Sequence, residues 1–259
     1  MEMIIENTSG TAEHTLTDSG FYWRESDGIK VLICQPLEAA GFVNGFSTRL
    51  GGVSPFPSGD LNLAGFNEDT AENIYENRRR FLLLFDGQLR LATVWQVHGN
   101  DIKTIRSIDE IGDSDDKCDA ITSDVRGILA GVKTADCVPV LIGDPVTGAF
   151  AAIHAGWRGT VESIVSRSVE NLQANFGADP NDLIAAIGPA ACGRRYEVGQ
   201  DVIDRFSKRR HEIEEELAAT GRSTARSAQV VTLETRKAKD YSVDADTLVE
   251  RWRVEAGEL

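Results

Sequence analysis

The sequence predicts a single domain that mixes helices and strands, and three observations support this fold class. The 259 residues are enough to bury one full hydrophobic core. Short apolar runs typical of strands alternate with stretches whose apolar residues recur at helical spacing. Because no repeat, low-complexity tract or linker divides the chain, we predict one domain over residues 1–259.

Composition argues against several classes of protein. Hydrophobic residues make up 41% and charged residues 26% of the chain, and no run of apolar residues is long enough to span a membrane. The net charge of −14 repels phosphate backbones and anionic lipids, so we expect no nucleic-acid or membrane partner. Residues 1–20 lack the features of a signal peptide, and the four cysteines show no CxxC spacing. These features predict a cytoplasmic protein with free thiols.

The first segment of the chain predicts strands that lead into an irregular loop. Apolar runs over residues 21–24 and 29–34 flank a turn at 26–28. A short strand over residues 41–49 then enters a loop with too many Gly and Pro residues for regular structure. Arg49 lies where this strand meets the loop, which suits anion binding, although an arginine in solvent is the more common outcome.

A helix is predicted next, from about residue 70 to residue 85. Asp69 and Thr70 can cap its first free N–H groups. Its apolar residues recur at helical spacing and should anchor it to the core. These anchors are Ile74, Phe81, Leu82 and Phe85.

Two of the four histidines end an apolar, strand-like run. The run over residues 92–97 ends at His98, which is followed by Gly99, and the run over residues 151–153 ends at His154. Side chains at strand ends commonly line clefts, although a satisfied histidine in a turn is the simpler interpretation. The other two histidines lie in polar segments and are expected on the surface: His14 and His211.

Cys137 lies at a break between two further apolar runs, over residues 127–133 and 138–143. A turn at 144–148 returns the chain to the strand of His154. If these neighbouring strands pair, Cys137 lies near the same edge of the sheet as His154.

The last segment of the chain predicts two helices separated by a strand. Apolar residues follow helical spacing from residue 160 to residue 176, and Gly177 should end this helix. A strand and sharp turn over residues 183–189 precede a charged helix at about 201–219.

One cysteine and two histidines at such positions suit two kinds of chemistry. Imidazole and thiolate bind zinc, and a catalytic zinc has three protein ligands with one open position. A nucleophilic pair, in which histidine generates the thiolate of Cys137 and Asp136 orients the pair, uses the same residues equally well.

Several motifs, in this order, resemble those of the laccase-domain family, also called the polyphenol oxidase or purine nucleoside phosphorylase family. The resemblance covers roughly residues 40–200. The motifs are Phe46-Ser47-Thr48-Arg49 with Gly51-Gly52-Val53-Ser54, Leu61-Asn62-Leu63, Gln96-Val97-His98-Gly99, Thr134-Ala135-Asp136-Cys137-Val138-Pro139, His154-Ala155-Gly156-Trp157-Arg158-Gly159-Thr160, and Ile187-Gly188-Pro189 with Tyr196-Glu197-Val198-Gly199.

The resemblance implies an α+β fold, a single domain of four layers (α/β/β/α) with mixed sheets. It also implies a metal, zinc or alternatively copper, held by His98, Cys137 and His154. Family members are described as cleaving purine nucleosides such as adenosine, inosine and methylthioadenosine with phosphate, which Arg49 would hold. Deamination of adenosine is a second activity described for them. Others are described as copper-dependent phenol oxidases, or as peptidoglycan editing amidases that remove a wrong amino acid from a cell-wall precursor.

The residues themselves help to choose among these activities. Four histidines are too few for a multicopper oxidase, and the two methionines, Met1 and Met3, offer no axial ligand for blue copper. The H-x-E and P-C-x-x-C patterns of the zinc nucleobase deaminases are also missing. We therefore predict a zinc-dependent purine nucleoside phosphorylase whose partners are a nucleoside and phosphate. The alternatives are the amidase, the phenol oxidase and a metal-dependent binding protein without catalytic activity.

In this prediction the catalytic residues are Arg49, which binds phosphate, and Asp136, which orients a ligand or shuttles a proton. Asn62, Gln96 and Arg158 shape the substrate pocket. The chain departs from the family near its C-terminus. The family's Cys-Thr pair and aromatic-Arg-Arg block are missing after Cys192.

Overall fold

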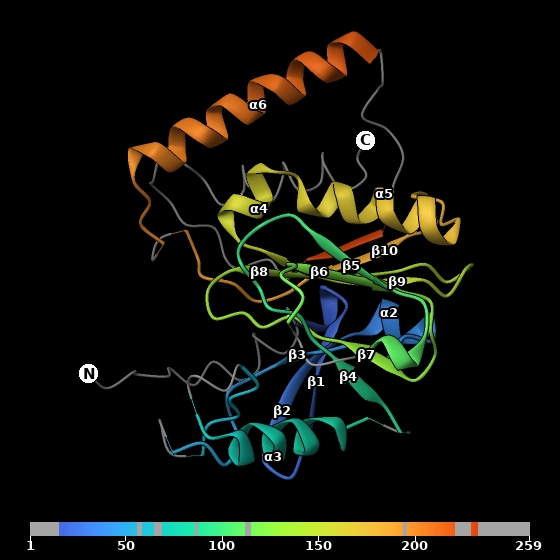
Figure 1. Ribbon diagram of the computed structural model, residues 1–259, viewed down its shortest axis with the longest axis vertical. Helices are drawn as coiled ribbons and strands as arrows, with labels where there is room; N and C mark the ends of the chain where they lie inside the picture. The colour runs from blue at the N-terminus through green and yellow to red at the C-terminus, as the bar shows by residue number, and fades with distance from the viewer. Residues whose placement is uncertain are drawn as a thin grey trace.

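The computed structural model describes residues 16–55, 59–64, 69–85, 88–111, 115–193, 196–220 and 229–232. These residues form four stacked layers (Figure 1). Helices α4 (Trp157–Val161) and α5 (Ile164–Phe176) cover one face of a six-stranded sheet, and α3 (Ala71–Leu82) lies beneath two smaller sheets. The predicted α+β sandwich with mixed sheets is confirmed, whereas His14 and residues 241–259 lie outside the described residues.

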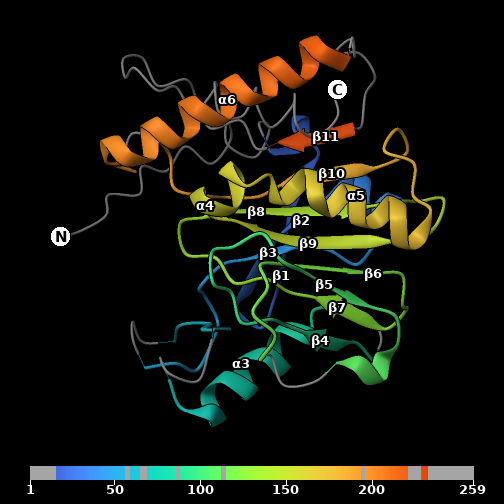
Figure 2. The same ribbon diagram turned by 45° about the horizontal axis from the view of Figure 1, so that its top comes forward.

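The six-stranded sheet has the spatial order β11-β10-β8-β9-β6-β5 (Figure 2). Central strand β8 pairs antiparallel with β9 and β10, while β5 with β6 and β10 with β11 are parallel pairs. The six strands are β5 (Ile102–Ile105), β6 (Ala120–Ser123), β8 (Val138–Gly143), β9 (Phe150–Ala155), β10 (Ile184–Ile187) and β11 (Gln229–Thr232).

The opposite β layer consists of a three-stranded sheet and a two-stranded sheet. Its strands are β1 (Phe21–Ser26), β2 (Ile29–Cys34) and β3 (Phe46–Ser47) in the first sheet, and β4 (Arg90–Ala92) and β7 (Ile128–Ala130) in the second. The side chains of strand β2 alternate between its two faces, and both faces are covered by other layers. Leu32 packs toward the six-stranded sheet, while Val31 and Ile33 pack toward α3.

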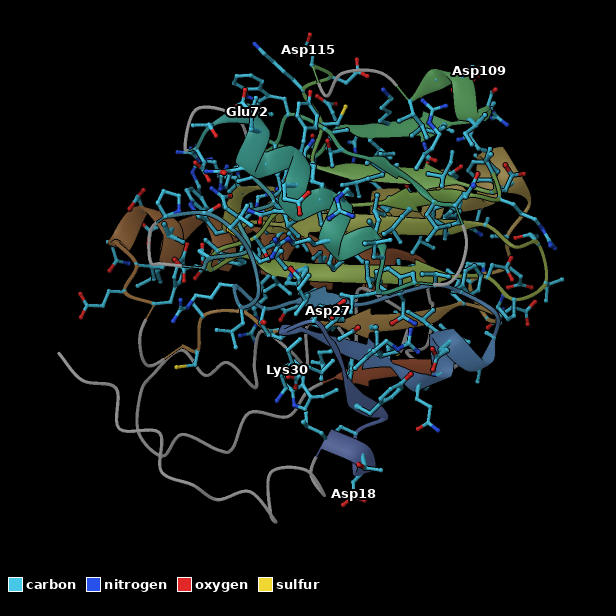
Figure 3. All side chains as sticks on the ribbon, turned by 90° about the horizontal axis from the view of Figure 1, so that it is seen from below. Asp18, Asp27, Lys30, Glu72, Asp109 and Asp115 are labelled. Atoms are coloured by element: carbon cyan, nitrogen blue, oxygen red, sulfur yellow. The ribbon has the colours of Figure 1, made fainter. Side chains whose placement is uncertain are left out.

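Seen from below, α3 lies in front of these strands, with Glu72 labelled in its first turn and Asp27 at the β1–β2 turn (Figure 3). Asp27 and Gly28 both have positive φ angles, 50° and 77°, as a tight two-residue hairpin requires. The Oγ1 atom of Thr70 accepts the backbone N–H of Asn73 at 3.3 Å. The predicted hairpin and the predicted cap of this helix are therefore confirmed.

Four predicted elements differ from the structure, and one of them is the strand expected over 92–97, because strand β4 ends at Ala92. The strand expected over 41–49 is limited to Phe46–Ser47, and that over 127–133 to Ile128–Ala130. The helix expected over 160–176 is broken between α4 and α5, because Ser163 adopts a left-handed conformation with φ 59°. Gly177 ends α5 as predicted, with φ 72°.

The remaining short elements are α2 (Gln35–Ala39) and a 3₁₀ turn at Ile108–Glu110, and the long helix α6 (Gln200–Thr220) follows β10. Helix α6 lies outside α4 and α5 (Figures 1 and 2). Among the residues that the structure describes, no helix is both long enough and apolar enough to cross a membrane.

Candidate metal centre

His154 lies near the carboxyl end of β9, and strand alternation decides where its ring points. Ile153 and Ala155 pack in the cluster under α5, whereas Phe150 packs on the opposite side, toward β4 and β7. His154 shares the parity of Phe150, so its imidazole points away from α5. The residue is only 2% exposed, so the nitrogen atoms of its ring need hydrogen-bond or metal partners inside the protein.

Cys137 immediately precedes β8 and reaches the same place through strand register. Val138 pairs with Ala155 and Pro139 pairs with His154, so the start of β8 lies beside the end of β9. Burial raises the pKa of the Cys137 thiol, and the charges of Asp136 and Asp119 raise it further. A cation beside the sulfur would reverse this effect and favour the thiolate.

His98 comes from a loop and not from a strand end, which corrects the expectation for residues 92–97. Strand β4 ends at Ala92, and the backbone N–H groups of Val97, His98 and Gly99 donate to the carboxylate of Asp119 at 3.1, 2.9 and 2.7 Å. A carboxylate that takes three successive N–H groups replaces the partners that a strand would offer. His98 accordingly has φ 59°, and its side chain is exposed.

The fold brings the three predicted ligands together. The ligand atoms of His98, Cys137 and His154 all lie within 4.8 Å of one another, and the two imidazole rings meet edge to face with centroids 4.8 Å apart. Two imidazoles and one thiolate form a donor set that zinc accepts, with a fourth position open. The residues present therefore fit a metal ion after small side-chain movements.

Gly156, the N-cap of α4, leaves room for the side chains of His98 and Cys137. A Cβ atom at this position would lie 3.0 Å from Cδ2 of His98 and 3.4 Å from Sγ of Cys137. Gly159 has a similar role further along α4, because a Cβ there would lie 2.6 Å from the carbonyl oxygen of Gly99. Both glycines let α4 approach the His98 loop closely.

Asp119 organises the centre, although the sequence did not predict this role for it. Its side chain is 0% exposed, and its Oδ1 lies 2.8 Å from Nδ1 of His154. Burial alone would raise its pKa, but the hydrogen bonds from His154, Gly99 and Val97 outweigh burial and lower it. With Nδ1 engaged, Nε2 is the ring nitrogen of His154 left for a metal.

The sequence predicts that Asp136 orients a ligand or shuttles a proton. This residue is exposed, and its backbone carbonyl accepts the N–H of Ala191 at 3.0 Å. Asp119, and not Asp136, bonds His154. The one sequence feature that pointed to Asp119 is its position directly before the wholly buried strand β6.

The predicted pocket residues lie in different settings. Both amide atoms of Gln96 bond the backbone of Lys133, at 2.6 and 2.7 Å, so this side chain joins two loops. Asn62 accepts the N–H of Ala64 through Oδ1 at 2.9 Å. Arg158 is exposed, with its guanidinium 5.1 Å from the ring centroid of Trp157.

Arg49 lies on the loop after β3, and its side chain is 58% exposed. Its Nη1 atom is 3.8 Å from Oδ1 of Asp60, which is too long for a hydrogen bond. Phe46, at the start of this segment, packs against Gly188, where a Cβ atom would lie 2.3 Å from the ring. Gly188 in turn donates to the carbonyl of Pro139 at 2.9 Å, which brings β3 to the Cys137 end of the six-stranded sheet.

Two exposed apolar side chains precede His98 in the sequence, and Tyr196 is another exposed aromatic residue. Trp95 and Val97 precede His98 and are 52% and 42% exposed. Tyr196 is 41% exposed; burial raises the pKa of its hydroxyl, and the charges of Cys137 and Asp136 raise it further.

Residues 43–251 match the profile of the family described as multi-copper polyphenol oxidoreductase laccase. The chain belongs to this laccase family. The match includes each of the predicted ligands and pocket residues, from Arg49 to Arg158.

Relatives of this laccase-family chain bear the name purine nucleoside phosphorylase. A protein of that name from Deinococcus radiodurans is 39% identical over 162 residues, which are 62% of this chain and 61% of the relative. Purine nucleoside phosphorylase YfiH from Escherichia coli is 35% identical over 179 residues, 68% of this chain and 70% of the relative. The matched segment thus spans less than two thirds of the Deinococcus protein.

A solved structure shares the fold. The crystal structure of YlmD from Geobacillus stearothermophilus superposes with a TM-score of 0.65 at 32% identity, covering 73% of this laccase-family chain and 72% of that protein.

Proposed function

We propose that this laccase-family chain is a zinc-dependent purine nucleoside phosphorylase. The observation that carries the proposal is the convergence of His98, Cys137 and His154 within 4.8 Å on a framework organised by Asp119. Three ligands of this kind leave one position for a substrate or water, as catalytic zinc sites do. The names of the relatives support the choice of reaction.

Zinc is proposed in preference to copper because of the histidine count. Beyond the two histidines of the centre, the described residues include only one further histidine, His211 on α6. Its Nε2 atom lies 3.3 Å from Oε1 of Glu215. A multicopper oxidase needs a larger histidine cluster. Bound here, zinc would supply a Lewis acid for an oxygen of the substrate or a water of lowered pKa.

In the proposed reaction a phosphate oxygen forms a bond to the anomeric carbon of the ribose while the bond to the purine nitrogen breaks. Arg49 holds the phosphate, because its guanidinium makes no hydrogen bond within the described residues and carries charge that suits an anion. Asp136 relays to the departing purine nitrogen the proton that the attacking phosphate gives up. Asn62 and Arg158 border the pocket in this proposal, and Gln96 supports it by holding the loop of Lys133.

The exposed apolar side chains near His98 in the sequence, together with Tyr196, suit a planar base. Trp95, Val97 and Tyr196 are exposed, although contact of apolar side chains with water is unfavourable. The chain as a whole is strongly anionic. An aromatic base can stack on such a surface, while the exposed guanidinium of Arg49 brings in phosphate against the net charge. Both features favour a nucleoside and phosphate as the pair of substrates.

The test is to incubate zinc-loaded protein with adenosine and inosine, with and without phosphate, and to identify the products by chromatography. The proposal expects free base and ribose 1-phosphate, formed only with phosphate. Cys192→Ser is the matched control, because this exposed cysteine lies outside the ligand set, whereas Cys137→Ser should be inactive. Inosine from adenosine without phosphate would assign deamination, and release of an amino acid from a cell-wall precursor would assign the amidase.

A further inference from the structure

Asn77 lies in the middle of the buried face of α3, at a helix position where an apolar side chain is expected. Its neighbours on that face, Ile74 and Phe81, are 0% and 7% exposed, and Asn77 itself is 0% exposed. A carboxamide buried in this way costs free energy unless its polar atoms are bonded. The partners of Asn77 therefore indicate what the residue does.

Those partners belong to both limbs of the loop that joins β3 to α3. Oδ1 accepts the backbone N–H of Val53 at 2.8 Å, while Nδ2 donates to Oγ of Ser54 at 2.9 Å. The same Nδ2 donates to the backbone carbonyl of Asn62 at 3.0 Å. One side chain thus bridges residues 53–54 on the outgoing limb and residue 62 on the returning limb.

Arg49 is placed mainly through its backbone, because its side chain forms only a long ion pair with Asp60. The guanidinium makes no hydrogen bond within the described residues, and the nearest carboxylate oxygen, on Asp60, is 3.8 Å away. The backbone of Arg49 is fixed, since its carbonyl accepts the N–H of Leu61 at 2.6 Å. The place from which Arg49 reaches out is therefore set by how the two limbs are joined.

We infer that Asn77 is the positioning residue of the phosphate site, holding the two limbs of the loop that carries Arg49 and Asn62. This inference rests on the proposed role of Arg49. Asn77 does not touch the substrate; it acts through the loop. A fixed loop keeps the guanidinium near its working position before phosphate arrives, so less order has to be gained on binding.

The test replaces Asn77 by leucine, which has the same branched shape and number of side-chain heavy atoms and suits the apolar face between Ile74 and Phe81. Leucine keeps the packing of α3 but cannot bond Val53, Ser54 or the carbonyl of Asn62. We expect the KM for inorganic phosphate to rise about ten-fold or more, with a smaller change in kcat and with unchanged zinc content. Asn77→Asp, which still accepts from Val53 but cannot donate to the carbonyl of Asn62, should give an intermediate KM.

Asn171→Leu is the matched control. This amide lies on α5, where its Oδ1 accepts from Oγ1 of Thr122 at 2.7 Å and of Thr104 at 3.2 Å, remote in the fold from the β3–α3 loop. Its loss should lower stability without raising the KM for phosphate. Equal rises in both variants would mean that general destabilisation is responsible, and the inference would be wrong.

A second measurement does not depend on catalysis. Trypsin cleaves after arginine, so the rate of appearance of the fragment that ends at Arg49 reports how firmly the loop is held. We expect faster cleavage in Asn77→Leu than in wild type or Asn171→Leu, and slower cleavage when inorganic phosphate is added to wild type. Cleavage of Asn77→Leu at the wild-type rate would overturn the inference. Phosphate-independent turnover by the wild type, with cleavage still faster in Asn77→Leu, would instead overturn the proposed function alone.

Discussion

Oδ1 of Asp119 lies 2.8 Å from Nδ1 of His154, and both side chains are almost wholly buried. The same carboxylate accepts three backbone N–H groups from the loop of His98. One residue therefore sets the ring orientation of one ligand and the backbone of another. Hydrogen-bonded carboxylates of this kind raise ligand basicity and hold the ring in place for a metal.

Replacing Asp119 by asparagine should weaken zinc binding about 10–100-fold, because the ligand set loses its orienting charge and a neutral amide cannot accept every bond. Competition with a chromophoric zinc chelator measures this affinity. Asp116→Asn is the control, since Asp116 is exposed and pairs with Lys103. Equal affinity in the Asp119 variant and the control would show that the carboxylate does not support the metal.

Removing a ligand should remove the metal. Protein prepared without added metal should carry about one zinc per chain, and alanine at His98, Cys137 or His154 should abolish most of it. The other cysteines provide controls, and serine at each should leave the zinc content unchanged: Cys34, Cys118 and Cys192. Elemental analysis of the purified variants decides this, and full occupancy in all three ligand variants would rule out the centre.

Arg49→Ala should reduce kcat/KM for phosphorolysis if the guanidinium bonds phosphate, because a charge-assisted hydrogen bond is lost. The corresponding loss of transition-state stabilisation is about 2 kcal/mol. Arg49→Lys keeps the charge but not the planar fork, so it should raise the KM for phosphate by a smaller factor. Steady-state kinetics at varied phosphate measure both effects. Arg79→Ala, an exposed arginine that pairs with Glu76 on α3, is the control.

If phosphate-independent deamination occurs, it should survive the Arg49 substitutions far better than phosphorolysis. Loss of both activities by the same factor would indicate that Arg49 maintains the structure of the site and does not hold phosphate.

Glu38 should make stability depend on pH. The hydrogen bond from Tyr22, and then the bond and charge of Arg24, hold the pKa of the Glu38 carboxyl below its usual value. Because the folded-state pKa is lowered, this contribution is fully present above the unfolded-state pKa of about 4.3 and is lost as the pH falls below it. Thermal unfolding of Glu38→Gln should therefore show a lower Tm than wild type at pH 7.

That difference in Tm should shrink as the pH falls below about 4.3, and it should vanish once the wild-type carboxyl is neutral in the folded state as well. Both side chains of the pair are partly exposed, so added salt should reduce the difference at pH 7 as well. A difference that persists unchanged at low pH would mean that packing, and not charge, is responsible.

The elements that the sequence predicted well depend on local chemistry. Asp27 and Gly28 specify a tight hairpin, Thr70 caps α3 and Gly177 ends α5, each through contacts within a few residues. The strand expected before His98 failed because its backbone bonds a carboxylate about twenty residues further along the chain. A pattern of apolar residues cannot indicate such a distant competitor for the N–H groups.

The site shows the same division. The residue types of His98, Cys137 and His154 indicated a metal centre, since donor chemistry can be inferred from side chains alone. The roles of Asp119 and Asn77 were not predicted, because a single acidic or amide residue in a sequence is more often exposed. Their burial, and the partners that make burial tolerable, exist only after the sheets and α3 have packed.

The amino-acid sequence by itself determined the donor types, the anionic character of the chain, the turns and the helix ends, because these follow from single side chains and short-range backbone preferences. Tertiary structure alone decided that His98 approaches His154 from a loop, that Asp119 rather than Asp136 orients the imidazole, and that Gln96 bonds a backbone. The physical reason is that these contacts depend on strand register and on competition for buried hydrogen bonds. Both are settled only when the whole sheet is assembled.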